Sequence, residues 1–217
     1  MRALALIQYI IIRFFKCWDE GVSLLPNIKE LIIVAGPSCA GKSYFIRQLK
    51  AGNRGIGSAL GIDDPAAWTF LNYRDYWSHS NAYQSKVVLH YDFYGLFKNG
   101  EFRRLKELVE INDSVKIVTL CVPSRLLFKR AILRVPKEIL SLFKVRVRNM
   151  SIRTRVYNQA LKIYQYGNKG QVSTLYSLWF KQIEELGVVR DWLFDSRSGV
   201  KPEILDARSI DYKLLVE

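Results

Sequence analysis

The stretch that decides the fold is L-I-I-V-A-G-P-S-C-A-G-K-S, which runs from Leu31 to Ser43. Residues 31–35 form a continuous apolar run with β-branched members, a pattern typical of a strand buried on both faces of a parallel sheet. Gly36 and Gly41 then bound a loop at the G-x-x-x-x-G-K-[ST] spacing, and a helical pattern follows. This order of strand, loop and helix predicts a loop whose backbone amides surround a phosphate group.

Individual side chains of the loop support this interpretation. Lys42 can reach the β- and γ-phosphates of a nucleotide, and the Ser43 hydroxyl can ligate Mg²⁺. The following helix points the positive end of its dipole at the anion. ATP or GTP with Mg²⁺ is therefore the expected ligand, and the competing interpretation is a glycine turn with an incidental lysine. The residues predicted to bind it are Gly36, Pro37, Ser38, Cys39, Ala40, Gly41, Lys42, Ser43 and Tyr44.

The composition is that of a globular protein with an unusual charge. The 217 residues are 49% hydrophobic and 24% charged, so general disorder is not expected. The 33 Lys and Arg residues exceed the 20 Asp and Glu residues, and the net charge of +13 favours anionic partners such as nucleotides or nucleic acid. Cys17, Cys39 and Cys121 are odd in number and far apart, which indicates neither a disulfide framework nor a zinc site and favours a cytoplasmic location.

The first segment reads as a basic amphipathic helix. Within residues 1–18, Arg2, Arg13 and Lys16 fall in one narrow arc opposite a wide apolar face. The apolar stretch before Arg13 is too short to cross a bilayer, and no secretory cleavage site follows it. Peripheral contact with the inner membrane surface, contact with a partner and packing on the core all remain open for this helix. We assign residues 1–27 to this helix and a linker, and the remaining residues, 28–217, to the main domain.

The segment after the loop helix is glycine-rich and then aromatic. Residues 56–62 are a candidate for a short second strand. Asp64 and Asp75 lie next to or among aromatic residues of the stretch from Trp68 to Trp77, where an acceptor molecule could stack and be hydrogen-bonded. Packing of these aromatic residues in the core is an equally good interpretation.

Two further strands are predicted. One is residues 86–92, with the sequence K-V-V-L-H-Y-D. It ends in Asp92, a carboxylate that could ligate Mg²⁺ or position a water molecule. His90 is expected to be packed within this strand. V-K-I-V-T-L-C-V, at residues 115–122, is the other buried strand, and an arginine-rich helix that contains Arg130 and Arg134 follows it.

The remaining segments are mainly helical. A helix is predicted between the two later strands. Pro136 permits a fresh helix start, and residues 134–170 are expected to form a lid or helical insertion. The basic residues there could clamp phosphates, bind a polyanion or simply face solvent. The other predicted elements are helices at 97–110, 151–166 and 173–186, and a last strand at 204–207 or 212–216.

Together, three segments resemble the guanylate-kinase group of P-loop kinases. They are G-P-S-C-A-G-K-S at 36–43, H-Y-D-F-Y-G at 90–95 and V-P-S-R-L-L-F-K-R-A-I-L-R at 122–134. The resemblance implies that Lys42 and Ser43 hold phosphate and Mg²⁺, that Asp92 lies near the metal, and that Arg130 and Arg134 face the phosphates. The family's nucleobase-binding segment has no copy before residue 86, so GMP is not implied as the acceptor.

We therefore expect an α/β fold of the P-loop NTPase type, a parallel sheet with helices on both faces, an arginine-rich helical lid and an extra N-terminal amphipathic helix. The expected function is transfer of the γ-phosphoryl group of ATP or GTP to an unidentified acceptor. The acceptor is hydroxyl-bearing or anionic, and either a small molecule or a polymer. Asp64, Asp75 or Asp92 would orient or deprotonate it.

Two alternatives are a nucleotide-dependent GTPase or ATPase switch and a nucleic-acid-directed ATPase or polynucleotide kinase. Against a GTPase switch, the segment N-K-G-Q at residues 168–171 lacks the final Asp of the guanine-reading pattern Asn-Lys-x-Asp. The net charge of +13 favours a nucleic-acid partner.

Overall fold

The described part of the chain is built on a six-stranded sheet. The computed structural model describes residues 28–73, 85–92, 101–112, 114–144, 152–187, 190–195 and 203–206. The strands are β1 (Glu30–Gly36), β2 (Thr69–Asn72), β3 (Lys86–Asp92), β4 (Val115–Cys121), β5 (Arg190–Asp195) and β6 (Glu203–Asp206). The helices are α2 (Lys42–Lys50), α3 (Arg54–Leu60), α5 (Glu101–Glu110), α6 (Ser124–Lys144), α7 (Ile152–Gly167) and α8 (Lys169–Leu186), with a 3₁₀ turn at Pro65–Ala67.

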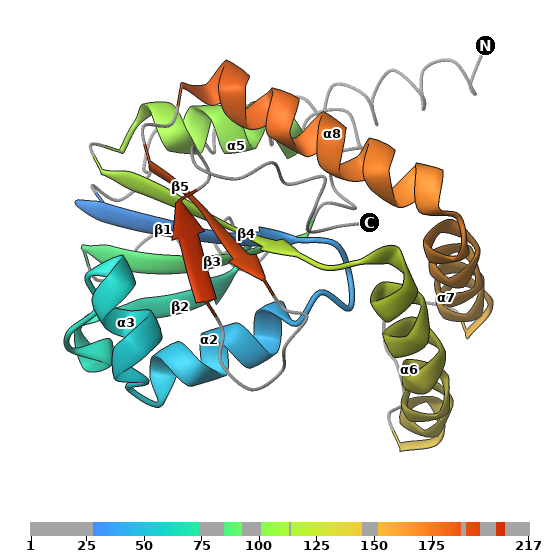
Figure 1. The fold of residues 1–217 in the computed structure, drawn as a ribbon. Coiled ribbons are helices and arrows are strands. Elements are labelled where there is room, and N and C mark those ends of the chain that lie inside the picture. The colour runs from blue at the N-terminus through green and yellow to red at the C-terminus, as the bar shows by residue number, and fades with distance from the viewer. Residues whose placement is uncertain are drawn as a thin grey trace, which may run out of the picture.

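The strand order is β2-β3-β1-β4-β5-β6. The first five strands are mutually parallel, and β6 pairs with β5 in the antiparallel sense. Helices α2 and α3 cover one face, α5 and α8 cover the other, and α6 and α7 stand beside the sheet (Figure 1). Parallel neighbours need crossover connections, and helices supply most of them. The expected α/β fold, with a parallel sheet and helices on both faces, is confirmed.

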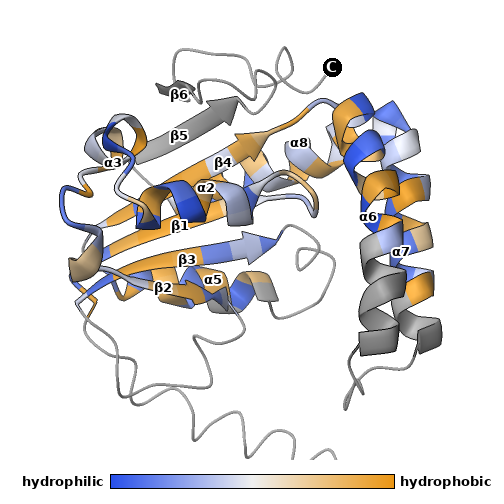
Figure 2. Ribbon diagram, turned by 90° about the horizontal axis from the view of Figure 1, so that it is seen from below, coloured by the Kyte–Doolittle hydropathy of each residue, from blue (hydrophilic) through white to orange (hydrophobic). Residues whose placement is uncertain are grey.

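The predicted strand at residues 31–35 is the central one, flanked by β3 and β4. Every side chain from Leu31 to Ala35 is at most 1% exposed. Hydrophobic residues also dominate the neighbouring strands, whereas α2 carries hydrophilic residues (Figure 2). Burial on both faces of the sheet explains why the sequence of β1 is uniformly apolar rather than alternating.

Helix α8 is fixed to its face of the sheet by large side chains at helical spacing. Val172, Tyr176, Trp179 and Ile183 are its buried residues. The Trp179 ring stacks on that of Tyr91 in β3 with centroids 5.5 Å apart, and its Nε1 donates to Thr119 Oγ1 in β4 at 2.9 Å. The middle of α8 is thereby held against β3 and β4.

The prediction of a short strand at residues 56–62 was wrong, because most of these residues belong to helix α3. The Asn53 side chain accepts hydrogen bonds from the amides of Gly55 and Ile56 at the start of the helix, and Gly61 ends it in a left-handed conformation. A Cβ on Gly57 would lie 2.7 Å from the Ile62 carbonyl oxygen, so the chain folds back too closely for a larger residue. The second strand is β2 instead.

The fresh helix start predicted at Pro136 was also wrong, because α6 runs through this residue to Lys144. The helix predicted at residues 151–166 is α7, and the one at 173–186 is α8 with an earlier start. A last strand near residue 204 is confirmed by β6, whereas β5 was not predicted. The alternative strand at 212–216 and the N-terminal segment 1–27 lie outside the described residues.

Candidate functional site

The candidate site begins where two neighbouring parallel strands end together. In the register of β1 and β3, Gly36 is the partner of Asp92. The loop of residues 36–43 leaves β1 at this point and leads into α2. The sheet therefore places the carboxylate of Asp92 beside the start of the loop, although more than fifty residues of chain separate them.

Two residues of the loop have left-handed backbone conformations. Gly41, the residue before α2, has φ 104° and contributes no side-chain cap. Cys39 also has a positive φ, of 69°. Backbone in which left-handed and right-handed residues follow each other turns successive N–H groups toward one point, and the first amides of a helix lack intrahelical acceptors. The loop and the α2 N-terminus can therefore bind an anion.

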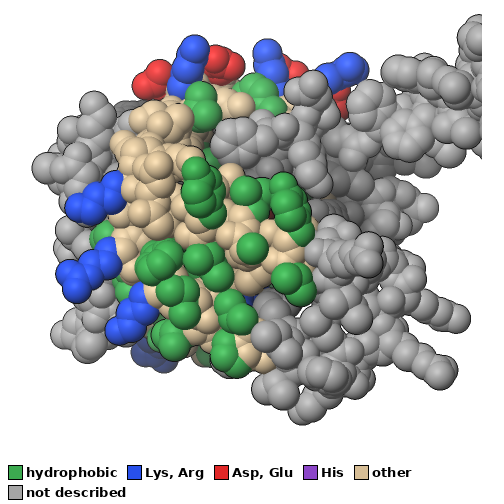
Figure 3. Space-filling model, turned by 90° about the vertical axis from the view of Figure 1, so that its right-hand side faces the viewer, with side chains coloured by type: hydrophobic (Ala, Val, Ile, Leu, Met, Phe, Trp, Pro, Cys, Tyr) green, Lys and Arg blue, Asp and Glu red, His purple; other side chains and the backbone are tan. Residues whose placement is uncertain are grey.

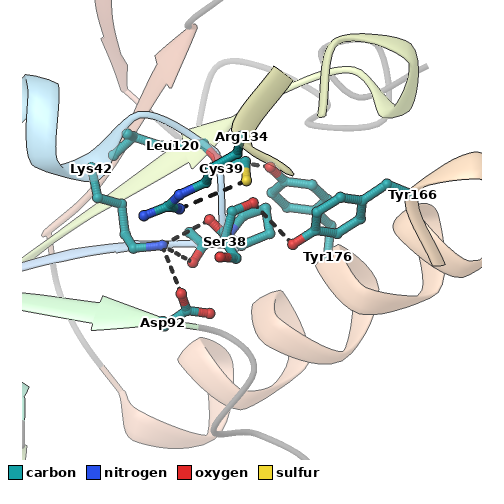
Figure 4. Close-up of polar contacts among 10 residues, drawn as sticks. Ser38, Cys39, Lys42, Asp92, Leu120, Arg134, Tyr166 and Tyr176 are labelled. Carbon is teal, nitrogen blue, oxygen red and sulfur yellow. Dashed lines mark hydrogen bonds and ion pairs between the residues drawn. The ribbon is translucent and has the colours of Figure 1, made fainter. Parts of the chain in front are cut away.

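Lys42 is buried at the centre of this arrangement, with 4% of the residue exposed. Its Nζ donates to the carbonyl oxygens of Gly36 at 2.8 Å and Pro37 at 2.7 Å, and it lies 3.3 Å from Asp92 Oδ2 (Figure 4). Burial lowers the pKa of Lys42, and the charge of Asp92 opposes that shift. A phosphate group arriving here would provide the buried ammonium with further negative charge.

Helix α6 directs two arginines to the loop. Arg130 Nη1 donates to the carbonyl oxygen of Ala40 at 3.2 Å, and Arg134 Nη1 lies 3.9 Å from Cys39 Sγ. The two residues are four apart and thus share one face of the helix. Burial lowers the pKa of the Arg130 guanidinium. The structure therefore brings Lys42, Asp92, Arg130 and Arg134 around one loop.

The remaining predicted residues are placed differently. Ser43 and Tyr44 are exposed in the first turn of α2. Asp64 caps the 3₁₀ turn through Ala66 N at 2.9 Å and precedes β2, at the opposite edge of the sheet from the loop. The structure does not bring Asp64 to the site, because parallel strands present their starts at one edge and their ends at the other. Asp75 lies outside the described residues.

Two tyrosines that the sequence analysis did not single out position the site. The Tyr166 hydroxyl, at the end of α7, donates to the Ser38 carbonyl oxygen at 2.9 Å. The Tyr176 hydroxyl donates to the Leu120 carbonyl oxygen at 2.8 Å and accepts from Val122 N at 3.1 Å. Both are buried, and Figure 4 shows Tyr166 directed at Ser38 in the loop and Tyr176 directed at Leu120 at the end of β4. No pattern in the sequence distinguishes them from ordinary core tyrosines.

A pocket of about 530 Å³ lies beside the loop. Pro37, Ser38 and Asp92 form one side of it, and the end of α7 and first turns of α8 form the other. The only sequence signal for this second side was the break between the two helices at Gly167 and Asn168. Figure 3 views the α6 to α8 side of the molecule, where basic side chains lie along the left margin, basic and acidic ones lie together along the top, and hydrophobic ones occupy the middle.

The oxygen atoms of the site suit a metal ion that is held jointly by the protein and by nucleotide phosphates, rather than by protein side chains alone. Among the residues that the structure describes, no cluster of three or more His, Cys, Asp or Glu side chains could hold a metal. Mg²⁺ is commonly held by one or two protein oxygens together with the phosphates of a nucleotide. The Ser43 hydroxyl and the Asp92 carboxylate fit that requirement.

Comparison with known proteins adds no family to this description, since no family model, curated protein or solved structure matches the chain. The resemblance to the guanylate-kinase group therefore rests on the three motifs alone. Among the helices in the described ranges, none is both long and apolar enough to cross a membrane.

Proposed function

We propose that this protein is a P-loop phosphotransferase that moves the γ-phosphoryl group of ATP or GTP to an acceptor hydroxyl, with Mg²⁺ bound beside the nucleotide. The observation that carries the proposal is the buried Lys42, held by the carbonyls of the glycine loop and paired with Asp92 across two parallel strands. Burying the Lys42 charge is unfavourable and the pairing with Asp92 does not fully offset the cost, so a bound phosphate would stabilise the charge further.

Catalysis of phosphoryl transfer consists mainly of positioning the reactants and stabilising charge, and different residues of the site would serve these two roles. The loop amides and Lys42 bind the β- and γ-phosphates. Arg130, anchored on the Ala40 carbonyl, and Arg134 stabilise the charge that develops during transfer. Ser43 and Asp92 would hold Mg²⁺, which supplies further neutralisation of phosphate charge when bound.

Two observations favour a kinase over a nucleotide-dependent switch. The phosphate-facing arginines come from this chain itself, on a helix that packs against α7. In addition, Asn168 accepts a hydrogen bond from Gln171 N as the cap of α8, so the Asn-Lys-Gly-Gln segment enters a helix and serves a structural purpose.

The test is nucleotide binding by the Lys42→Met variant, measured by calorimetry with ATP and Mg²⁺. Loss of a charge-assisted contact to phosphate should weaken binding about 10- to 100-fold. Lys50→Met is the matched control, because Lys50 is exposed on the same helix with its Nζ 5.1 Å from the centre of the Phe70 ring. Equal affinities for wild type and Lys42→Met would refute the proposed phosphate site.

A second candidate, a polynucleotide-directed kinase or ATPase, is favoured by two aromatic side chains on α7. Tyr157 and Tyr164 are 66% and 69% exposed and lie seven residues apart, on one face of the helix. Exposed aromatic rings on a protein of net charge +13 are suited to stacking against bases of a single strand.

A further inference from the structure

The pocket beside the loop differs in charge from the rest of the protein. Among its described lining residues, Asp92 is the one with a charged side chain, and none is a lysine or arginine, although the chain carries 33 such residues. The other polar side chains of the described lining are amides and hydroxyls, from Ser38, Gln165, Tyr166, Asn168, Gln171 and Thr174. A site for an anionic molecule would be expected to have the opposite character.

We infer that this pocket binds the phosphoryl acceptor, and that the acceptor is a neutral, hydroxyl-bearing small molecule such as a sugar or a nucleoside. The inference rests on the proposed function and narrows it, since it excludes nucleoside monophosphates and polymers from the acceptor site. The volume of about 530 Å³ is within the range of roughly 300–1,000 Å³ that is usual for small-molecule sites.

The side-chain amides are available to recognise hydroxyl groups. None of the hydrogen bonds among the described residues uses the side-chain amide of Gln165 or Gln171. Each amide can donate and accept, which matches a hydroxyl group that does both. Pro37, Val172 and Leu175 provide apolar contacts in the same lining, as expected for the face of a sugar ring or a base.

The position of Asp92 distinguishes the acceptor from the nucleotide donor. The polyphosphate of the donor belongs with Lys42 and the loop amides, whereas the Asp92 carboxylate can accept a hydrogen bond from an acceptor hydroxyl group. Asp92 has 37% of its side chain exposed, lines the pocket and lies 3.3 Å from Lys42 Nζ. It therefore stands at the boundary between the two substrates.

The transfer step follows from this arrangement. The acceptor oxygen forms a bond to the γ-phosphorus while the bond from that phosphorus to the β–γ bridging oxygen breaks, and the nucleoside diphosphate leaves with the electron pair. The acceptor hydroxyl gives up its proton to solvent as the new bond forms, and Asp92, which lines the pocket, can orient that hydroxyl by accepting its hydrogen bond beforehand. Lys42 and Arg130 face the loop, where the phosphate charge is redistributed.

The experiment uses the full chain with saturating non-hydrolysable ATP analogue and Mg²⁺. Binding is measured by saturation-transfer NMR for three pairs of compounds: uridine and uridine 5′-monophosphate, ribose and ribose 5-phosphate, and glucose and glucose 6-phosphate. Transfer from labelled ATP is measured for the same compounds. We expect at least one neutral compound to bind in the presence of the analogue, and to bind and react about tenfold better than its phosphorylated partner.

Variants assign that binding to the pocket. Gln165→Ala and Gln171→Ala should each raise the KM of the neutral acceptor about two- to tenfold, since each removes one hydrogen bond, and leave the KM of ATP within about twofold. Lys181→Ala is the control, because Lys181 is exposed farther along α8 and does not line the pocket. Melting temperatures of the variants confirm that they remain folded.

Three outcomes would overturn the inference: no neutral compound binding, preference for the phosphorylated partners, or neutral ligands being displaced by the ATP analogue, which would assign the pocket to the donor. Each is distinguishable from failure of the proposed function. If ATP still binds in a Lys42-dependent manner, only the acceptor assignment fails, whereas loss of that dependence removes both.

Discussion

The Lys42 ammonium group already has three oxygen partners in the structure: the carbonyls of Gly36 and Pro37, and the Asp92 carboxylate. Its pKa is lowered because burial disfavours the charge more than Asp92 favours it. The residue therefore contributes less to stability than its contacts suggest. A bound phosphate would change that balance, so nucleotide should raise the melting temperature of the protein through its preference for the folded state.

Tyr176 makes a prediction that is independent of nucleotide chemistry. Replacing it with Phe leaves the buried Val122 amide without its hydroxyl acceptor, and Leu120 loses a donor to its carbonyl. The free energy of unfolding, measured with urea, should fall by about 1–3 kcal/mol. Tyr164→Phe is the control, because that ring is 69% exposed, and it should change stability by less than about 0.5 kcal/mol. Equal stability of both variants would contradict the role of Tyr176.

His90 predicts a dependence of stability on pH. Burial in β3, aided by the charge of Lys42, lowers the pKa of His90 from 6.5 to about 4. Between these values the unfolded chain binds a proton that the folded chain does not, so the free energy of unfolding should rise with pH across this window. The contribution is fully present above pH 6.5 and is lost as the pH falls toward 4.

The measurement compares urea denaturation of wild type and His90→Gln at pH 4.5 and pH 7. The difference between the two pH values should be smaller in the variant, whatever its absolute stability, because carboxyl groups that also titrate in this range are common to both proteins. The same difference in both proteins would show that His90 is not the titrating group.

At the scale of elements, α6 links the end of β4 to the loop after β1. It begins directly beyond β4, and Arg130 reaches the carbonyl of Ala40 two turns later. Because α6 starts at the end of a strand in the sheet, the position of Arg130 relative to the loop is fixed. This arginine could therefore stabilise charge at the loop without movement of a distant segment.

We expect Arg130→Ala to lower kcat for phosphoryl transfer by about 10²–10³, with a smaller effect on the KM of ATP, because its charge acts mainly on the transition state. Arg125→Ala is the matched control, since Arg125 is exposed and roughly 140° away around the same helix. The measurement is kcat of wild type and of both variants at saturating ATP. A loss of equal size in both variants would indicate a general electrostatic effect rather than a specific contact.

Elements with a strong local signal were predictable, and the others were decided by tertiary contacts. β1 has a continuous apolar sequence and β3 and β4 are mainly apolar, as expected for strands covered on both faces of a sheet. The segment at 56–62 was misread because its glycines lower helix propensity, whereas the Asn53 cap and the turn at Gly61 favour α3. Pro136 was misread because a helix that packs along α7 can retain a proline that would end an isolated helix.

The candidate site divides in the same way. The loop, Asp92 and the two arginines follow from sequence patterns, because each lies at a strand end or on one helical face. No sequence pattern places Gln165, Tyr166 and Gln171 at the site. They lie beside the loop because α8 packs on the sheet through Trp179, which is a tertiary contact. Sequence alone does not show which two helices close a pocket.

At the scale of the whole molecule, the net charge of +13 predicts binding of single-stranded oligonucleotides at low salt that weakens steeply as salt rises. Fluorescence anisotropy across a salt series measures it, and ATP should not compete. A Tyr157→Ala/Tyr164→Ala double variant should leave this binding unchanged if charge alone is responsible. A severalfold loss of affinity in that variant would favour the polynucleotide-directed candidate, because stacking would then contribute.

The central place of β1 also has a consequence for the order in which the protein forms during synthesis. Both neighbours of β1 are encoded far downstream, at residues 86–92 and 115–121, so the strand leaves the ribosome without a partner. Contacts between distant segments form slowly. The glycine loop, although early in the chain, can therefore acquire its shape only after β3 and β4 have emerged, and a nascent chain shorter than this should be unable to retain nucleotide.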